Sequence, residues 1–189
     1  RSAISNNFIQ KNPCKLYGIG PMFRRERPQK GRYRQFNQIN FEILGTHDEF
    51  ADVELIILAD NILKKLLPNT NLTLQINSLG DKNTLKKFKD DLSAYFIKYK
   101  NDLSEESKIK IASNPLRILD SKNENDLKIV YSSPKITDYY SEEARNKFLN
   151  IQNILSENSI KYSLNPNLVR GLDYYCHTVF EFKTDDLGS

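Results

Sequence analysis

The sequence contains very little cysteine: Cys14 and Cys176 are its only thiols among 189 residues. So few cysteines cannot form a disulfide framework, and nothing in the chain has metal-ligand spacing. We therefore expect free thiols, as in a reducing cytoplasm, with a single disulfide as the alternative. No apolar run approaches the roughly 18 residues of a membrane span. Residues 1–10 also lack the basic-then-apolar pattern of a secretory signal.

The composition, 39% apolar and 28% charged, is typical of a soluble globular protein with one core or one core plus a small appendage. The net charge of +4 falls short of the bias of a dedicated nucleic-acid clamp. The chain lacks an initiator methionine and stops directly after a predicted strand, so we expect both ends to be cuts within a longer protein.

A basic run between Arg24 and Arg34 is the strongest local charge feature, with Glu26 as its only acid. Its cations are Arg24, Arg25, Arg27, Lys30, Arg32 and Arg34. A solvated basic face is the ordinary interpretation of such a run. Here Phe23 and Phe36 border it, so a nucleotide would suit it: guanidinium groups bind phosphates in bidentate fashion, and Phe36 could stack on a base. The glycine-rich phosphate loops of other nucleotide-binding proteins have no counterpart here.

Two strands are predicted around this loop, from 16 to 24 and from 36 to 44. The second alternates, with Ile39, Phe41 and Ile43 on one face and Gln38, Asn40 and Glu42 on the other. We predict a hairpin with an apolar side and a polar side next to the arginine-rich loop.

A helix is predicted from 49 to 66, with Asp48 as its cap and Pro68 beyond its end. The expected core stripe consists of Leu55, Leu58, Ala59, Ile62, Leu63 and Leu66. A short strand at 72–76 and a turn at 77–80 follow.

Helical spacing dominates from 81 to about 158, where Ser104 and Ser141 start helices. The expected buried stripes are Leu85, Phe88, Leu92, Phe96 and Tyr99, and then Ala144, Phe148, Ile151 and Leu155. The stretch around Asn123 and Asn125 is predicted to be a surface loop. Strands are expected again at 162–164 and from about 168 to 182. We therefore divide the chain into 1–80, a helical insertion at 81–160, and 161–189.

The last predicted strand carries a second polar group, in which Arg170 lies near Asp173, Tyr174 and Tyr175. Tyrosines on strands usually belong to a core or its rim, but an arginine among apolar residues needs a partner. The carboxylate and amides of the hairpin complement this cation and these phenols. Together they could hold a small zwitterion beside a nucleotide. The two histidines are isolated, and we interpret both as structural or solvated.

Two segments carry a family resemblance. Residues 20–36, GPMFRRERPQKGRYRQF, resemble motif 2 of the class II aminoacyl-tRNA synthetases in its histidyl form. Residues 168–175, LVRGLDYY, followed by TVFE at 178–181, resemble the second histidine-specific signature of that family. The resemblance implies an α+β fold: a mixed, mainly antiparallel sheet flanked by helices, with a helical insertion. It also implies ATP-dependent activation of L-histidine and transfer to tRNA(His), in a cytoplasmic homodimer.

The resemblance also implies a role for each matching residue. Arg24 and Arg170 would be the catalytic arginines, on the two sides of the α-phosphate of ATP. The implied histidine-binding residues are Arg24, Gln38, Glu42, Arg170, Tyr174 and Tyr175. The implied ATP-binding residues are Arg24, Glu26, Arg32 and Phe36. Magnesium would accompany ATP as in the family, with no protein ligands for it identifiable in this sequence.

Cys176 and His177 depart from the family pattern, in which an Asn and a basic residue are more usual. Motif 1, the Pro-Glu-Gly-Thr segment, motif 3 and the anticodon-binding domain are absent, so we expect this piece alone to be inactive or nearly so. Two alternatives stay open. One is the synthetase-like regulatory subunit of ATP phosphoribosyltransferase, and the other is a non-catalytic RNA-binding module.

Overall fold

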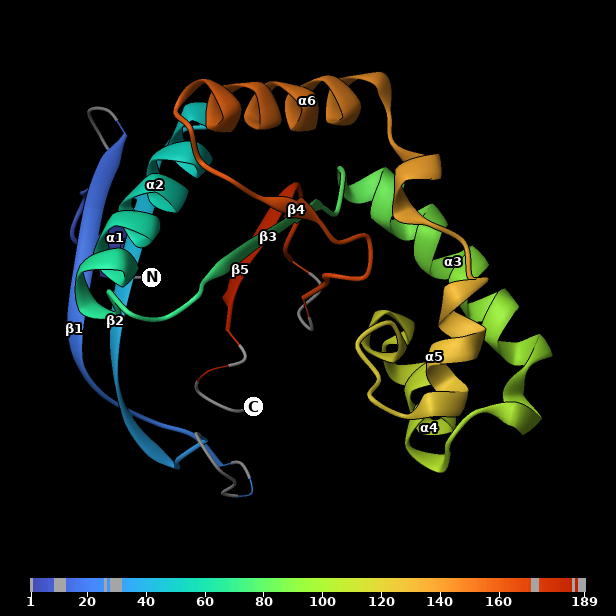
Figure 1. Cartoon of the computed structure of the whole chain (residues 1–189). Coiled ribbons are helices and arrows are strands. Elements are labelled where there is room, and N and C mark those ends of the chain that lie inside the picture. Colours follow the sequence, from blue (N-terminus) through green and yellow to red (C-terminus); the bar gives the residue numbers. More distant parts are fainter. Residues whose placement is uncertain are drawn as a thin grey trace. The chain divides into compact units, whose positions relative to one another are not determined.

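The computed structural model describes residues 2–8, 13–25, 27, 32–170, 174–184 and 186. The chain divides into two compact units, Arg1–Leu72 with Thr184–Ser189, and Thr73–Lys183. Each unit combines helices with a small sheet (Figure 1). The predicted α+β class with mainly antiparallel pairing is therefore confirmed.

A long hairpin and a helix make up the first unit. The elements are α1 (Ser2–Ser5), β1 (Cys14–Phe23), β2 (Gln35–Leu44) and α2 (Glu49–Leu66). The strands pair antiparallel from Cys14 opposite Leu44 to Phe23 opposite Gln35. α2 runs along the hairpin (Figure 1), and the Lys15 ammonium lies 2.6 Å from the Glu54 carboxylate of α2. The predicted hairpin is confirmed.

Helix α2 has the predicted bounds, and the Asp48 side chain caps it by accepting from the Phe50 N–H. The predicted core stripe is wrong at Leu66, which is 66% exposed, and it missed the buried residues Val53 and Ile56. The other five predicted residues are half-buried. The predicted stripe extended to the end of the helix. A two-stranded hairpin offers only a narrow surface, so the fully buried residues of α2 all lie in its first half.

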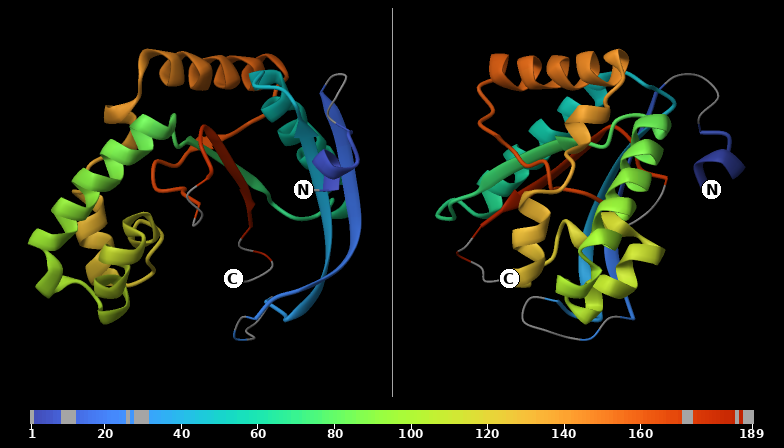
Figure 2. Two further views of the ribbon diagram at one scale, coloured as in Figure 1. Left: turned by 180° about the vertical axis from the view of Figure 1, so that it is seen from behind. Right: turned by 90° about the vertical axis from the view of Figure 1, so that its right-hand side faces the viewer.

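A mixed three-stranded sheet with a helical segment forms the second unit. Its strands are β3 (Thr73–Ser78), β4 (Ser163–Leu164) and β5 (Thr178–Lys183), in the order β4-β3-β5. β3 pairs parallel with β4 and antiparallel with β5. The helices are α3 (Lys82–Lys98), α4 (Glu105–Ser113), α5 (Glu124–Tyr131) and α6 (Glu142–Glu157), and the 3-10 turns are Lys100–Asp102, Pro115–Ile118 and Ile136–Tyr139. An extended stretch leads from α6 back to the sheet (Figure 2).

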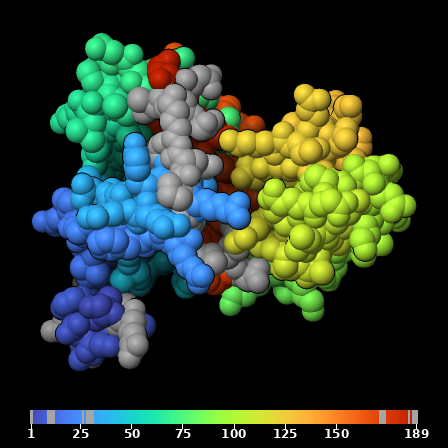
Figure 3. Space-filling view, turned by 90° about the horizontal axis from the view of Figure 1, so that it is seen from below, coloured from blue at the N-terminus to red at the C-terminus, as the bar shows by residue number. Residues whose placement is uncertain are grey.

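The helical segment packs around the predicted stripes. Leu85, Phe88, Leu92 and Phe96 of α3 are buried, although Tyr99 is 41% exposed. All four predicted stripe residues of α6 are buried as well. Ser104 and Ser141 cap α4 and α6, as predicted. Figure 3 shows the helices around residues 100–135, in lime to amber, as one continuous body.

The predicted loop around Asn123 is wrong, because α5 begins there. The Asn123 side chain accepts hydrogen bonds from the Asn125 and Asp126 N–H groups and so caps the helix. The helix is held by burial of Val130 and by Asp126, which is fully buried. A short amphipathic helix with a polar first turn resembles a loop in sequence, which explains the error.

The predicted strand from about 168 to 182 is also wrong at residues 168–170 and 174–177, because β5 begins only at Thr178, and residues 171–173 lie outside the described residues. Residues 165–168 form a turn instead, with the Leu168 N–H donating to the Asn165 carbonyl at 3.0 Å. His177, just before β5, has a φ of 56°, which interrupts an extended strand. At the other boundary, β3 continues through Ser78, two residues beyond the predicted end.

Candidate functional site

The polar face of the hairpin combines three side chains of β2 with two glycines of β1. Gln38 and Asn40 lie opposite Gly20 and Gly18, so the partner strand contributes no side chains there. A Cβ at either glycine would meet no atom within 4 Å. The Gln38 amide donates to the Asn40 side-chain oxygen. The result is open space above the strands, bordered by amide groups that can bind a polar ligand.

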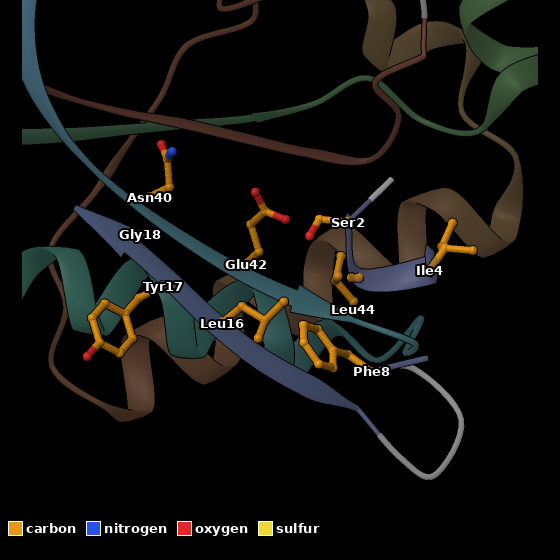
Figure 4. A pocket seen from close by; sticks show the side chains of 10 residues that line it. Ser2, Ile4, Phe8, Leu16, Tyr17, Gly18, Asn40, Glu42 and Leu44 are labelled. Atoms are coloured by element: carbon orange, nitrogen blue, oxygen red, sulfur yellow. The ribbon is translucent and has the colours of Figure 1, made fainter. Parts of the chain in front are cut away.

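A hollow of about 430 Å³ adjoins this face and includes Glu42. Figure 4 shows Glu42 and Asn40 pointing to the same side of the hairpin. Apolar residues of α1 and of both strands supply most of the remaining lining, among them Ile4, Leu16 and Leu44. A carboxylate at the edge of an apolar hollow can accept hydrogen bonds from a small cationic or N–H-bearing ligand.

Arg24 follows β1 directly and is held by the hairpin at three points. Its N–H donates to the Arg34 carbonyl at 2.9 Å, and its Nε donates to the Tyr33 carbonyl at 2.7 Å. The guanidinium carbon lies 4.4 Å from the centre of the Phe36 ring. The hairpin thus orients the guanidinium group before any ligand is present, and two predicted site residues, Arg24 and Phe36, are in contact.

The basic loop is described only in part. Arg25, Arg27 and Arg32 are exposed, which suits contact with an anion from solvent. Glu26, predicted to contact ATP, lies outside the described residues, as does Lys30. Among the described residues, no group of histidine, cysteine and acidic side chains could hold a metal ion.

Arg170 belongs to the second unit and lies after the 165–168 turn. Its Nη2 donates to the Phe180 carbonyl of β5 at 2.6 Å. The arginine is half-buried, so this bond gives the charge one of the partners that burial demands. The remaining N–H groups of a guanidinium fork leave capacity to bind an anion.

Tyr174 and Tyr175 lie against each other, with ring centres 4.6 Å apart and planes 36° from parallel. Tyr174 is 70% exposed and Tyr175 41% exposed. The hydrogen bond to Tyr175 is the main cause that raises the pKa of Tyr174. Asp173, predicted to lie beside them, is outside the described residues. Because both side chains are partly or largely exposed, solvent and ligands can reach the two phenols.

The predicted site residues fall into two groups. Arg24, Arg32, Phe36, Gln38 and Glu42 lie in the first unit, and Arg170, Tyr174 and Tyr175 in the second. The structure brings Arg24 and Phe36 together within the first group and the two tyrosines together within the second. Sequence reasoning missed Asn77, a buried strand residue that bonds the turn before Arg170. β3 reads TLQINS and already contains Thr73, Gln75 and Ser78, so an amide at position 77 gave no distinct signal in the sequence.

This combination of a motif-bearing hairpin and a mixed sheet agrees with a family match. The model of the tRNA synthetase class II core domain (G, H, P, S and T) matches residues 2–188. The chain therefore belongs to the class II tRNA synthetase core domain family.

Curated proteins similar to this chain include histidine–tRNA ligases. The chain is 54% identical to that of Wolbachia pipientis wMel and 50% identical to that of Ehrlichia ruminantium (strain Gardel), over its whole length. It covers 47% and 46% of these two proteins, so it spans about half the length of the curated relatives it matches.

A solved structure is also similar, that of apo S. aureus histidyl-tRNA synthetase, with a TM-score of 0.70 and 32% identity. The match covers 96% of this chain and 42% of the other. An ATP phosphoribosyltransferase regulatory subunit/histidyl-tRNA synthetase from Bacillus halodurans C has a TM-score of 0.62 over the whole chain and 52% of the other. At 18% identity it shows the fold alone.

Proposed function

We propose that the full-length protein containing this chain is a histidine–tRNA ligase, which activates L-histidine with ATP and transfers it to tRNA(His). The observation that carries this is identity of 47–54% along the whole chain to proteins of that name. The orientation of Arg24 by the hairpin supports the proposal, and so does the open polar strand face above Gly18 and Gly20.

In the proposed first step, a carboxylate oxygen of histidine attacks the α-phosphorus of ATP. The bond to pyrophosphate breaks, and histidyl-adenylate and pyrophosphate form. In the second, a hydroxyl at the 3′ end of the tRNA attacks the histidyl carbonyl carbon and AMP leaves. Such chemistry depends on positioning and charge stabilisation more than on a protein nucleophile. Magnesium would accompany ATP and neutralise phosphate charge.

The residues take these roles in the proposal. Arg24 and Arg170 stabilise charge on the α-phosphate and bind the histidine carboxylate. Gln38, Glu42, Tyr174 and Tyr175 select histidine, because a carboxylate accepts from one imidazole N–H and a phenol contacts the other nitrogen. Glu26, Arg32 and Phe36 bind ATP. Phe36 supplies the face on which adenine stacks.

The remaining features of the proposal concern the whole protein. We place it in the cytoplasm, as a homodimer, with residues 1–80 and 161–189 contributing to the catalytic core and 81–160 as a helical insertion. Residues 81–160 contain all of α3 to α6, which supports that division. Among the described residues, no helix has the length and apolar character to cross a membrane.

The test is histidine-dependent exchange of pyrophosphate into ATP by the full-length protein. We expect exchange with histidine and none with other amino acids, and loss of exchange in Arg170→Ala with histidine binding partly retained. An unchanged rate in that variant would remove the role given to Arg170. Salt-dependent binding of generic RNA without ATP or histidine binding would favour an RNA-binding module instead.

A further inference from the structure

We propose that Asn77 is a positioning residue for Arg170. Its buried carboxamide holds the 165–168 turn and so fixes the position of the Arg170 backbone. Asn77 lies in β3 and is 3% exposed. Its Nδ2 donates to the Leu168 carbonyl at 3.0 Å and to the Pro166 carbonyl at 3.2 Å. Leu168 is two residues before Arg170. The importance of this for catalysis depends on the proposed function.

The turn is tied to β3 by more than Asn77. The Asn165 N–H donates to the Ile76 carbonyl at 3.0 Å, and the Asn165 side-chain amide donates to Gln75 Oε1 at 2.8 Å. The Asn167 N–H in turn donates to Asn165 Oδ1 at 3.0 Å. The Asn165 end of the turn is thus fixed by its bonds to Ile76 and Gln75, and the Leu168 end, toward Arg170, by its bond to Asn77.

The guanidinium is fixed separately, by the Phe180 carbonyl of β5. β3 and β5 are paired antiparallel, with Asn77 opposite Val179 and Ile76 opposite Phe180. The backbone leading to Arg170 is therefore bonded to β3 and its guanidinium group to β5, at neighbouring positions of one sheet. A displaced turn would move the Arg170 backbone while its guanidinium group stayed bonded to β5. The guanidinium group would then lose its orientation.

An asparagine suits this position for a definite chemical reason. A carboxamide carries two N–H donors on one nitrogen, which matches the two carbonyl acceptors. An ionised aspartate of the same shape offers only acceptors, and an apolar residue leaves the two carbonyls without these donors. A residue needed only for core packing requires no such hydrogen bonds, and an aliphatic side chain would pack better at this strand position.

The experiment uses the full-length protein and two readouts, histidine-dependent pyrophosphate exchange and hydrogen–deuterium exchange of the backbone. In Asn77→Ala and Asn77→Asp we expect kcat for activation to fall by about tenfold to a hundredfold, with much smaller changes in KM. Amides in the 165–170 peptide should exchange faster. Gln75→Ala, which removes only the bond to Asn165, should give a smaller fall in kcat and a smaller rise in amide exchange of the 165–170 peptide. This variant keeps the test informative if the Asn77 variants do not fold.

Two controls separate positioning from lost stability. Ile151→Ala, in the core of α6, should lower the melting temperature without lowering kcat or loosening the 165–170 peptide. Adding Asn77→Ala to Arg170→Ala should change the residual exchange rate of Arg170→Ala, measured at raised enzyme concentration, by less than about twofold, because the two residues act through one group. A full further loss in the double variant would overturn the inference. So would an unchanged 165–170 peptide in Asn77→Ala, or a loosened one with unchanged kcat.

The two hypotheses fail in different ways. If the wild-type protein gives no histidine-dependent exchange, the proposed function is wrong, while hydrogen exchange still decides whether Asn77 holds the turn. If the wild type is active and Arg170→Ala loses most of its exchange rate but Asn77→Ala behaves as wild type, only the inference about Asn77 is overturned.

Discussion

The guanidinium carbon of Arg24 lies 4.4 Å from the centre of the Phe36 ring, across the ends of the two hairpin strands. The Arg24 Nε is bonded to the Tyr33 carbonyl at the same time. The ring therefore has one face in contact with a cation. If the proposed ATP site is correct, an adenine that stacks on Phe36 uses the other face of the ring or displaces Arg24.

Phe36→Leu is therefore expected to weaken ATP binding more than histidine binding. Stacking of a base on an aromatic ring contributes about 1–3 kcal/mol, so KM for ATP should rise by roughly 5-fold to 150-fold. The lost cation–π contact is worth only about 0.5–1 kcal/mol at an exposed site, so KM for histidine should rise by less than about fivefold. Pyrophosphate exchange at varied ATP and histidine measures both. Phe36→Tyr, which keeps the ring, is the control. Equal KM values for ATP in Phe36→Leu and in the wild type would contradict the stacking role.

Arg24→Lys tests whether the shape of the cation matters in addition to its charge. A lysine keeps the charge but cannot donate to Tyr33 while presenting a planar fork to phosphate. We expect kcat for activation to fall on the order of 10²-fold, as for misplacement of a positioning group. Arg25→Lys, at the exposed neighbouring position, should retain most activity. If both variants behaved alike, the run would act as a diffuse basic surface.

The sequence was most informative where the signals were local. The caps Asp48, Ser104 and Ser141 and the stripes of α3 and α6 were predicted because a cap and a 3.6-residue period are properties of one segment. The hairpin was predicted for a similar reason, from two strands flanking one loop.

The errors occur where tertiary contacts decide. Residues 168–170 have strand-like composition, yet side-chain bonds from Asn77, distant in sequence, hold the preceding residues in a turn. α5 was missed because its first turn is polar and its stability comes from burial of Val130 and from the hydrogen bonds that Asp126 accepts. For the candidate site, the proposed members come from residue types and the family resemblance. Neither could predict that Arg24 rests on Phe36, since that contact depends on the closed geometry of the hairpin.

Gly20→Ala tests whether the open strand face is a ligand site. Nothing lies within 4 Å of a Cβ at this position, and the substitution replaces a flexible residue in a strand. Stability should stay the same or rise by about 0.5–1 kcal/mol. If histidine binds above Gly20, next to Gln38, the extra methyl group should raise its KM by about tenfold or more. Unchanged KM together with unchanged urea unfolding would place the ligand elsewhere.

The buried carboxylate of Asp126 predicts a pH dependence of stability. It accepts hydrogen bonds from the Ser104 N–H and from the hydroxyls of Ser104, Ser107 and Ser121, at 2.6–2.8 Å. Burial alone would raise its pKa, but these bonds favour the charged form more strongly and lower the pKa from 3.8 to about 2. The folded state thus holds this proton less tightly than the unfolded state does.

The sign of the effect follows from that difference. Because the folded pKa is depressed, the stabilisation is fully present above about pH 4 and is lost as the pH falls toward 2. At about 1.4 kcal/mol per pKa unit, it amounts to roughly 2 kcal/mol. Urea unfolding of the wild type and of Asp126→Asn should show a gap at pH 7 that narrows between about pH 4 and pH 2. Ser113→Ala, at an exposed hydroxyl of α4 outside this cluster, should show no such narrowing. A gap of constant size would mean that the loss in Asp126→Asn comes from packing, because only an ionising group gives a difference that depends on pH.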